Sequence, residues 1–196
     1  VGVVLVLVAA PLIVVLLRRA GKLDDKNYAE LMHRCRSWAV LAPLMIGLYH
    51  GGVEISEGIS VDRKATLAAG AVANLTAQGS TLTVANMSDV LDAASTIMAP
   101  YSTSPLKIKV SCINIDGNKN ATVKWSVARN DTARATGSSI SLPGALAVAN
   151  TQLVFGEVSY TYTPTVGYVI TGSLGLSDEM YMAPRISAPA YNSIAC

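Results

Sequence analysis

Side chains that commonly hold metals or act as acids and bases are few in this chain of 196 residues. It has two histidines, His33 and His50, and three cysteines. His33 and Cys35 stand close together, but a zinc site needs more ligands than these two supply. We therefore expect no metal site and no cofactor.

One short motif matches a known catalytic spacing. Ser104-Pro-Leu-Lys107 has the Ser-x-x-Lys pattern of acyl-serine enzymes, which requires the first turn of a helix to place the lysine one turn above the serine. Here the motif opens a predicted strand. Glu157 is the one acid in an apolar neighbourhood, and we expect it to face solvent or to pair with an arginine. The sequence therefore indicates no catalytic residue and no enzyme.

The three cysteines cannot all pair within one chain. Cys112 falls on the apolar side of an alternating strand pattern, which is typical of a small core residue. Cys196 can reach Cys112 in an oxidising compartment, but connectivity does not follow from sequence. A Cys112–Cys196 disulfide and a reduced core cysteine both remain open.

Among the elements of the chain, the most informative is an apolar stretch at residues 38–53. It runs without a turn residue into a polar, alanine-rich helical pattern. The charged fraction is 14%, against about 25% in soluble domains. The flanking charges are arranged as a membrane requires, which favours a span over the buried core helix of a soluble protein. Sixteen residues at about 1.5 Å each span only ~24 Å, so local bilayer thinning or helical partners are expected.

The charges near this stretch predict its orientation. Residues 18–36 hold six Lys or Arg against three Asp or Glu, whereas the chain after His50 holds nine against ten. Lys and Arg next to a span stay on the cytoplasmic side. The domain after Val53 is therefore predicted to be extracytoplasmic.

Residues 1–35 form an apolar and basic leader of unassigned role. Residues 1–17 are a second apolar run, followed by Arg18 and Arg19. This run is either a second span, which makes the anchor a two-pass hairpin, or the product of a misassigned start. Its basic residues lie on the wrong side for a signal peptide. The predicted division is 1–35, a membrane and stalk helix at 36–79, and an extracytoplasmic domain at 80–196.

The predicted long helix, from about residue 37 to 78, carries features that favour helix packing. Gly47 and Gly51 form a small-xxx-small pair, which lets helices approach closely in lipid, and Pro43 lies in the same stretch. Residues 67–73 are mostly small and suit contact with a sheet or another helix. Large apolar residues of the solvated half are expected to share one face: Ile55, Ile59, Leu67, Val72 and Leu75.

The remainder predicts an α+β domain. A short helix, capped by Asn86 or Ser88, is expected to stop at Pro100. The apolar period then changes to two, which predicts an antiparallel meander of about four strands: 106–112, 121–127 after a hairpin turn at 116–118, 153–163 after a loop at 130–150, and 176–182. The long helix is the expected cover of this sheet.

Two tyrosines of the third predicted strand stand out. Tyr160 and Tyr162 fall on one face of residues 153–163. We expect them to lie in the core, with a place in an interface as the alternative.

Several segments resemble the TadE/TadG-like family of pilus-assembly proteins. They are Trp-Ala-Val-Leu-Ala-Pro-Leu-Met at 38–45, Gly-Val-Glu-Ile-Ser-Glu-Gly-Ile-Ser-Val-Asp-Arg-Lys at 52–64, Ala-Ala-Ser-Thr-Ile-Met-Ala-Pro-Tyr at 93–101, Glu-Val-Ser-Tyr-Thr-Tyr-Thr-Pro at 157–164 and Met-Tyr-Met-Ala-Pro-Arg at 180–185. The resemblance covers residues 38 to about 190. It implies a pilin-like fold and a subunit of the bacterial inner membrane that serves the machine building Flp-type adhesive pili.

The chain departs from the family in two places. Ser37 stands where the family has a Glu that supports recognition by the prepilin peptidase and register between subunits. The family also begins with a short basic leader, not a second apolar run. We hypothesise that residues 1–37 come from a shifted frame or misassigned start. The hypothesis fails if neither other reading frame encodes a basic leader ending in Val-Glu-Phe or similar before Ala39.

Two functions remain after these arguments. The favoured one is a membrane-anchored, pilin-like subunit that associates with other pilus-assembly or pilin-like subunits and with membrane lipid. The alternative is a tethered periplasmic sensor or ligand-binding module, which needs a pocket with convergent polar groups. A net charge of +2 gives no reason to expect nucleic acid, and no small-molecule substrate is expected.

Overall fold

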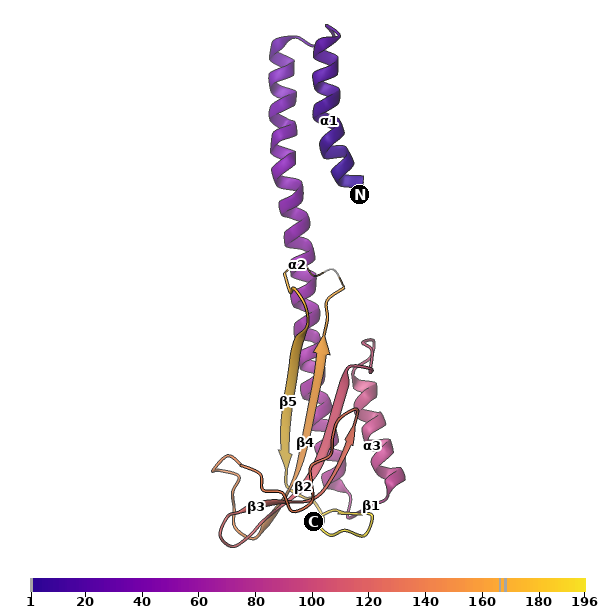
Figure 1. The fold of residues 1–196 in the computed structure, drawn as a ribbon, viewed down its shortest axis with the longest axis vertical. Helices are drawn as coiled ribbons and strands as arrows, with labels where there is room; N and C mark the ends of the chain where they lie inside the picture. Colours follow the sequence, from indigo (N-terminus) through magenta and orange to yellow (C-terminus); the bar gives the residue numbers. More distant parts are fainter. Residues whose placement is uncertain (1, 166, 168) are drawn as a thin grey trace. The chain divides into compact units, whose positions relative to one another are not determined.

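The computed structural model describes residues 2–165, 167 and 169–196, with side chains from residue 6 onward (Figure 1). The chain divides into two compact units, Val1–Glu54 and Ile55–Cys196. Helix α2 (Asp25–Gln78) contributes to both.

The first unit is a helical hairpin. Helix α1 (Gly2–Arg19) is followed by a short turn, in which Gly21 has a φ of +68°, and then by α2. Arg18 joins the two helices through an ion pair of 2.9 Å with Asp25 and lies 4.2 Å from the centre of the Tyr28 ring. The two apolar runs of the sequence therefore belong to neighbouring helices.

The long helix ends where the sequence predicted, but the predicted start near residue 37 was wrong. Helix α2 begins at Asp25, and the Asp24 carboxylate accepts a hydrogen bond from the backbone N–H of Asn27, as a cap does. Polar residues 25–36 form helix as readily as apolar ones. The change from polar to apolar side chains near residue 37 therefore reflects a change in what surrounds the helix. It does not mark where the helix begins.

The second unit is α+β, as predicted. Helix α3 (Val84–Ile97) and a four-stranded antiparallel sheet follow α2. The strands are β2 (Leu106–Ile115), β3 (Ala121–Arg129), β4 (Thr151–Tyr162) and β5 (Leu174–Met182). A separate pair of short parallel strands, β1 (Thr81–Leu82) and β6 (Ala190–Tyr191), was not predicted.

The strand order corrects the predicted meander. In space it is β3-β2-β4-β5, so β2 pairs with both β3 and β4. The connection at residues 130–150 carries the chain from one side of β2 to the other. Apolar residues on the loop, Ile140, Leu142 and Leu146, pack there on buried side chains of the sheet.

Of the five large apolar residues expected to share one face of α2, Val72 is fully buried and the other four are not. Ile55, Ile59 and Leu67 are about half exposed or more, and Leu75 is 37% exposed. The buried positions carry mainly small side chains: Val61, Ala65, Ala68, Ala69, Val72, Ala73 and Ala77. Small residues between 68 and 73 therefore meet the sheet, as the sequence indicated for this stretch, and close approach rather than residue size selects the buried face.

Helix α3 has a different cap from the two that were predicted. Thr83 is the N-cap, and its hydroxyl accepts a hydrogen bond from the backbone N–H of Asn86. The Asn86 side chain accepts one in return from the backbone N–H of Thr83, which completes a capping box. Asn86 is thus the third residue of the helix, and Ser88 lies within it.

Candidate functional site

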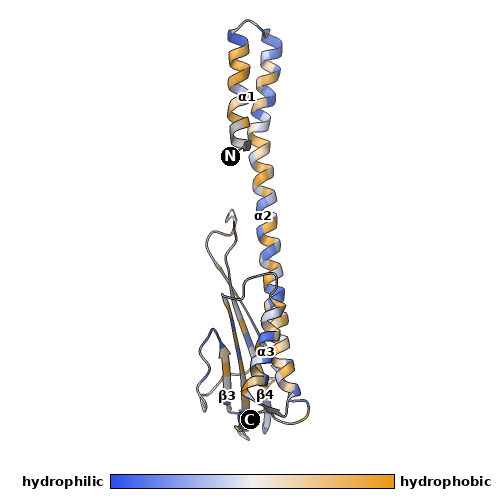
Figure 2. Ribbon diagram, turned by 90° about the vertical axis from the view of Figure 1, so that its right-hand side faces the viewer, coloured by the Kyte–Doolittle hydropathy of each residue, from blue (hydrophilic) through white to orange (hydrophobic). Residues whose placement is uncertain are grey.

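The most prominent candidate surface is the apolar part of α2, residues 38–53. Among the described residues, α2 is the helix long and apolar enough to cross a membrane, a test that a signal sequence or the core helix of a soluble protein also passes. Its ribbon here is mainly orange (Figure 2). Trp38, Met45 and Tyr49 are more than 60% exposed, so the described part of the chain leaves much of this surface open.

Three residues in this stretch were predicted to pack against other helices. Pro43 is exposed inside the helix, where it removes one backbone donor. A Cβ built on Gly47 meets no described atom within 4 Å. Gly51 is buried. Of the glycine pair, Gly47 therefore presents an open small-residue surface.

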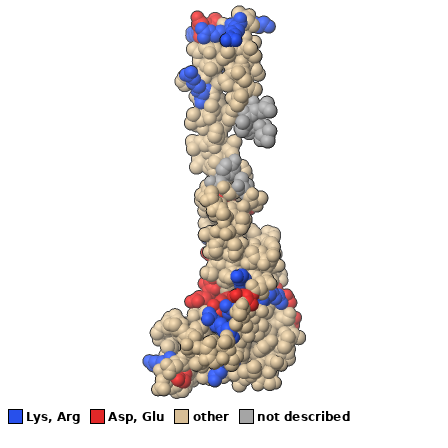
Figure 3. All heavy atoms as spheres, in the orientation of Figure 1, with Lys and Arg blue, Asp and Glu red and all other residues tan. Residues whose placement is uncertain are grey.

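The uncharged stretches of the two helices in the hairpin do not lie level with each other. Counting outward from the Arg18–Asp25 contact at about 1.5 Å per residue, Pro11 lies level with about residue 32, and Gly2 with about residue 41. The uncharged part of α1 thus runs beside the charged beginning of α2, where Arg34 and Arg36 lie. Blue and red side chains gather at the joined end of the hairpin (Figure 3). The uncharged stretch of α2, residues 37–53, extends beyond α1.

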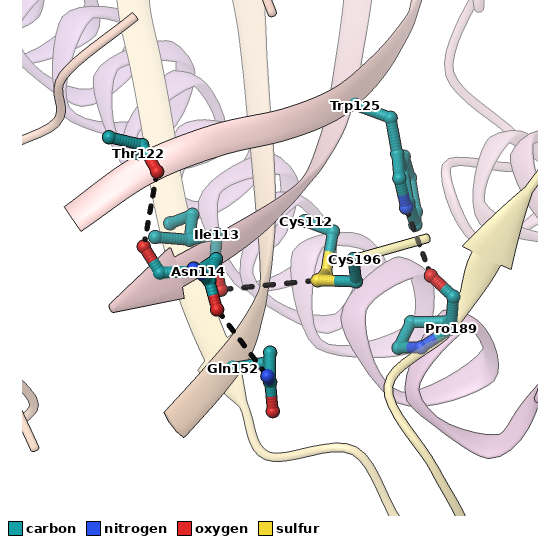
Figure 4. Close-up of a disulfide and its surroundings, with 8 residues drawn as sticks. All are labelled: Cys112, Ile113, Asn114, Thr122, Trp125, Gln152, Pro189 and Cys196. Carbon is teal, nitrogen blue, oxygen red and sulfur yellow. Dashed lines mark hydrogen bonds between the residues drawn. A yellow bond between two sulfur atoms is a disulfide. The ribbon is translucent and has the colours of Figure 1, made fainter. Parts of the chain in front are cut away.

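In the second unit the structure forms the disulfide that the sequence left open. Cys112 and Cys196 are bonded, with their Cα atoms 5.7 Å apart (Figure 4). Cys112 is fully buried, on the apolar side of β2 as expected. The indole N–H of Trp125 donates a hydrogen bond of 2.9 Å to the carbonyl of Pro189. The C-terminal segment is therefore attached to the sheet at two points, while Cys35 is free.

Tyr160 and Tyr162 lie in the core of the second unit. They are 6% and 5% exposed. The Tyr160 hydroxyl donates to the carbonyl of Ser102, and the Tyr162 hydroxyl donates to the Glu57 carboxylate, both at 3.0 Å. Burial, and then the nearby Tyr101, raise the pKa of Tyr160. Through these hydrogen bonds, both tyrosines link strand β4 to other segments of the second unit.

A polar hollow of about 370 Å³ on the outer face of the sheet was not foreseen. Strand pairing puts Lys109 beside Glu157, and Glu157 beside Glu179. The alternation of Lys107 and Lys109 was the signal in the sequence for this hollow. Only the pairing of β2 with β4 shows that these lysines lie beside charged residues of the neighbouring strand. The hollow is lined by Lys107, Lys109, Asp131, Glu157, Val158, Ser159, Ser177, Asp178 and Glu179.

Three of the charged residues that line this hollow, Lys109, Asp131 and Glu157, take part in ion pairs. Lys109 contacts Asp131 at 3.0 Å, and this hydrogen bond, followed by one from the backbone N–H of Thr132, lowers the pKa of Asp131. The Arg134 guanidinium donates two hydrogen bonds, of 2.7 and 3.0 Å, to the Glu157 carboxylate. These bonds raise the pKa of the guanidinium. The expected pairing of Glu157 with an arginine is therefore confirmed.

The Ser-x-x-Lys motif does not take the helical form that acyl-serine catalysis requires. The stretch from Ser104 to Lys107 leads into β2 and not into a helix, as predicted. Over the residues whose placement is described, no group of three or more His, Cys, Asp and Glu side chains is arranged to hold a metal.

Comparison of the chain with protein families, with curated proteins and with solved structures gave no match.

Proposed function

We propose that this chain is a membrane-anchored, pilin-like subunit that takes part in the assembly of an Flp/Tad-type pilus by protein–protein association. The observation that carries the proposal is the exposed, uncharged surface of α2 at residues 38–53. Exposing so many large apolar side chains to water is unfavourable. Lipid and neighbouring helices are the surroundings that suit it.

The proposed location is the bacterial inner membrane, with one span and the domain after Val53 in the periplasm. Basic residues on the side of the hairpin turn support this orientation. The Cys112–Cys196 disulfide supports it independently, because such bonds persist in oxidising compartments such as the periplasm.

The stagger of the hairpin favours one full span over two. Two spans of equal depth require uncharged stretches that lie level with each other. Here the uncharged part of α1 lies beside Arg34 and Arg36, and charged side chains at the centre of a bilayer are costly.

Association through the anchor is supported by the open surface at Gly47. Without a hydrophobic driving force between helices in lipid, close packing at small residues drives their association. The pilus as the destination rests on the resemblance of residues 38 to about 190 to TadE/TadG-like proteins, together with a long helix that covers an antiparallel sheet.

Membrane fractionation combined with protease accessibility tests the anchor. We expect the chain in the membrane fraction, with residues after Val53 digested only when the protease reaches the periplasmic face. A freely soluble, monomeric full-length chain contradicts the proposal. So does a protected C-terminal domain in cells whose outer membrane alone has been opened.

Co-purification with pilus-assembly components tests the partner class, and a pair of glycine variants tests the surface. Gly47→Leu is expected to reduce the cross-linked or co-purified partner several-fold, because the side chain holds the helices apart. Gly52→Leu is the matched control, since Gly52 is equally open but lies about 140° further around the helix. Equal effects of the two variants argue against a specific surface.

The polar hollow on the sheet supports the second candidate, a tethered periplasmic ligand-binding module. Lys107, Ser159 and Ser177 line it beside the paired charges. Charged residues that already pair with each other are poor anchors for a ligand. The variant Lys107→Ala tests this candidate. If it abolishes the activity of the protein in cells but leaves membrane insertion and partner association unchanged, the result favours ligand binding over assembly.

A further inference from the structure

We propose that copies of this chain join edge to edge, with strand β5 of one copy pairing antiparallel to strand β3 of the next copy. The inference concerns the second unit alone and does not depend on the anchor at residues 38–53. It goes beyond the proposed function because it names a partner, a second copy of this chain, and the surface that binds it.

The two edge strands of the sheet, β3 and β5, both have open backbone. Loop residues 137–140 bond the backbone of the first part of β3 and cover the edge there. Within the described part of the chain, the backbone of residues 124–129 has no hydrogen-bond partner outside β2. Strand β5 pairs with β4 on one side and with no strand on the other. Unpaired backbone groups along a sheet edge are a template for another strand.

One row of residues that crosses the whole sheet shows that the two edges match. The row is Ala128, Lys109, Glu157 and Glu179, which lie opposite one another in neighbouring strands. In an antiparallel sheet, opposite residues point their backbone groups either toward each other or away from each other. Ala128 and Glu179 therefore both point outward or both point inward. The Glu179 N–H donates a hydrogen bond of 2.8 Å to the Asp178 carboxylate of its own strand, which indicates the outward direction.

The charges of the two edge strands are opposite. Strand β5 carries Asp178 and Glu179 and no base, whereas β3 carries Lys124 and Arg129 and no acid. Pairing of two β5 strands about their centres sets Asp178 opposite its own copy, and like charges directly opposite each other are destabilising. Pairing of residues 124–129 with their own copy sets Lys124 opposite Arg129. Pairing of β5 with β3 avoids both repulsions.

One register continues the row of residues into the next copy and also pairs the charges. It sets Glu179 opposite Ala128, and therefore Asp178 opposite Arg129. Arg129 lies on the helix side of the sheet, where it bonds Asp92 of α3, and its side chain is 29% exposed. The alternation of side chains along β5 places Asp178 on the same side. The carboxylate and the guanidinium therefore meet on one face of the joined sheets.

An apolar groove of about 220 Å³ lies beside the open part of the β3 edge and receives the incoming strand. The same register sets Met180 of β5 opposite Val127 of β3, and both side chains lie on the helix side, against the core. The flexible side chain of methionine fills irregular apolar gaps well. The groove is lined by Val84, Met87, Ser88, Leu91, Val127, Ala128, Arg129 and Tyr191.

The contact joins two different surfaces of the chain. Each added copy therefore still offers one free β5 edge and one free β3 edge. Head-to-tail contacts of this kind produce rings when the rotation closes and open filaments when it does not.

Cross-linking between two full-length forms of the chain tests the inference. Both forms carry Cys35→Ser, which keeps the disulfide and leaves no other thiol. One form carries Ala128→Cys and the other Glu179→Cys, each with its own affinity tag. The purified, detergent-solubilised forms are mixed and treated with a mild oxidant. We expect a cross-linked dimer that contains both tags, because opposite residues of an antiparallel pair have Cα atoms about 5.5 Å apart, within the range of a disulfide.

A form with Gly175→Cys in place of Glu179→Cys is the matched control. Gly175 lies on the same face of β5 as Glu179, and a Cβ there meets no described atom within 4 Å. We expect about tenfold less mixed dimer with this form, because four residues correspond to about 13 Å along a strand. Circular dichroism of each form shows that the fold is kept.

Two results of this experiment overturn the inference. If the mixed dimer is no more abundant than with the Gly175→Cys control, the two edges do not pair in this register. If the Glu179→Cys form cross-links as strongly with itself as with the Ala128→Cys form, β5 pairs with another β5.

A change of charge at Asp178 tests the ion pair. Asp178→Lys in the Glu179→Cys form is expected to lower the yield of mixed dimer several-fold, because it sets two cations opposite each other. Asp178→Glu is expected to keep the yield. Equal yields for these two variants contradict the contact between Asp178 and Arg129.

The result is independent of the test of the anchor, since the cross-link requires no membrane. A chain that cross-links as expected but is free in solution supports edge pairing and contradicts the proposed anchor. A membrane-bound chain that gives no cross-link has the opposite meaning.

Discussion

Gly156 in β4 lies close to the backbone of the long helix. A Cβ built there would lie 2.9 Å from the carbonyl oxygen of Ala69, and 3.1 and 3.2 Å from the Cβ and N of Ala73. Two of these three atoms are backbone, which cannot move aside as a flexible side chain does. The absence of a side chain at this position therefore sets the distance between the layers.

We predict that Gly156→Ala lowers the free energy of unfolding by about 1–3 kcal/mol, the usual range for overpacking. Gly175→Ala in β5 is the control, because a Cβ there meets no described atom within 4 Å. Urea unfolding of the detergent-solubilised chain, followed by the fluorescence of the buried Trp125, measures both. A loss as large for Gly175→Ala as for Gly156→Ala contradicts the role given to the close contact.

The buried Tyr160 hydroxyl predicts a loss of stability in alkali. Its folded-state pKa is raised, so above its unfolded value of about 10 the folded state holds the proton that the unfolded state releases. Stability is therefore complete below about pH 10 and declines as the pH rises through the folded pKa. Unfolding measured between pH 9 and pH 11 is expected to show a smaller decline in Tyr160→Phe. An unchanged decline assigns the effect to other groups, such as Tyr181, whose pKa is also raised.

At the scale of elements, each helix boundary follows from the hydrogen bonds that the chain can make at that point. Thr83 and Asn86 exchange bonds in the capping box of α3. Asn86 and Ser88 have cap-forming side chains too, which is why the pattern favoured them. The extended backbone of Thr83, with φ −84° and ψ 170°, distinguishes the true cap.

We predict that Thr83→Ala destabilises the second unit by about 1 kcal/mol, since it leaves backbone donors of α3 without a partner. Ser88→Ala is the comparison, because Ser88 lies inside the helix and is exposed. Its change is expected to be within about 0.5 kcal/mol, as for most surface substitutions. Thermal unfolding of both variants under one condition decides between the two caps, and a larger effect at Ser88 reverses the assignment.

At the scale of the whole molecule, covalent links decide which distant segments stay together. The Cys112–Cys196 disulfide joins residues 84 positions apart. It ties the C-terminal segment to the centre of the sheet, close to the Trp125–Pro189 hydrogen bond (Figure 4). In the orientation proposed above, this bond forms after the domain has crossed the membrane.

We predict that Cys196→Ser lowers the free energy of unfolding by about 2–5 kcal/mol, as for other native disulfides that close long loops. Cys35→Ser, at the free cysteine of the first unit, serves as the control and is expected to leave the unfolding of the second unit unchanged. Denaturant unfolding with and without a reducing agent measures both. An equal response of the two variants to reduction rules out the disulfide as the cause.

Local patterns in the sequence were sufficient for much of this molecule. The change of apolar period located the four long strands, Pro100 limited α3, and the predicted end of the long helix at residue 78 is the end of α2. The α+β class and the apolar surface at residues 38–53 followed as well. These features depend on near neighbours in the chain, through backbone periodicity and side-chain polarity.

Tertiary structure alone decided the strand order, which of the two apolar faces of α2 is buried, and the bond between Cys112 and Cys196. The large side chains Ile59 and Leu67 gave the stronger apolar signal, yet the alanines face the sheet because Gly156 lets the two backbones approach closely. Each of these outcomes depends on pairs of residues tens of positions apart, whose meeting is set by packing between elements. Sequence periodicity carries no information about such pairs, so only the folded chain reveals them.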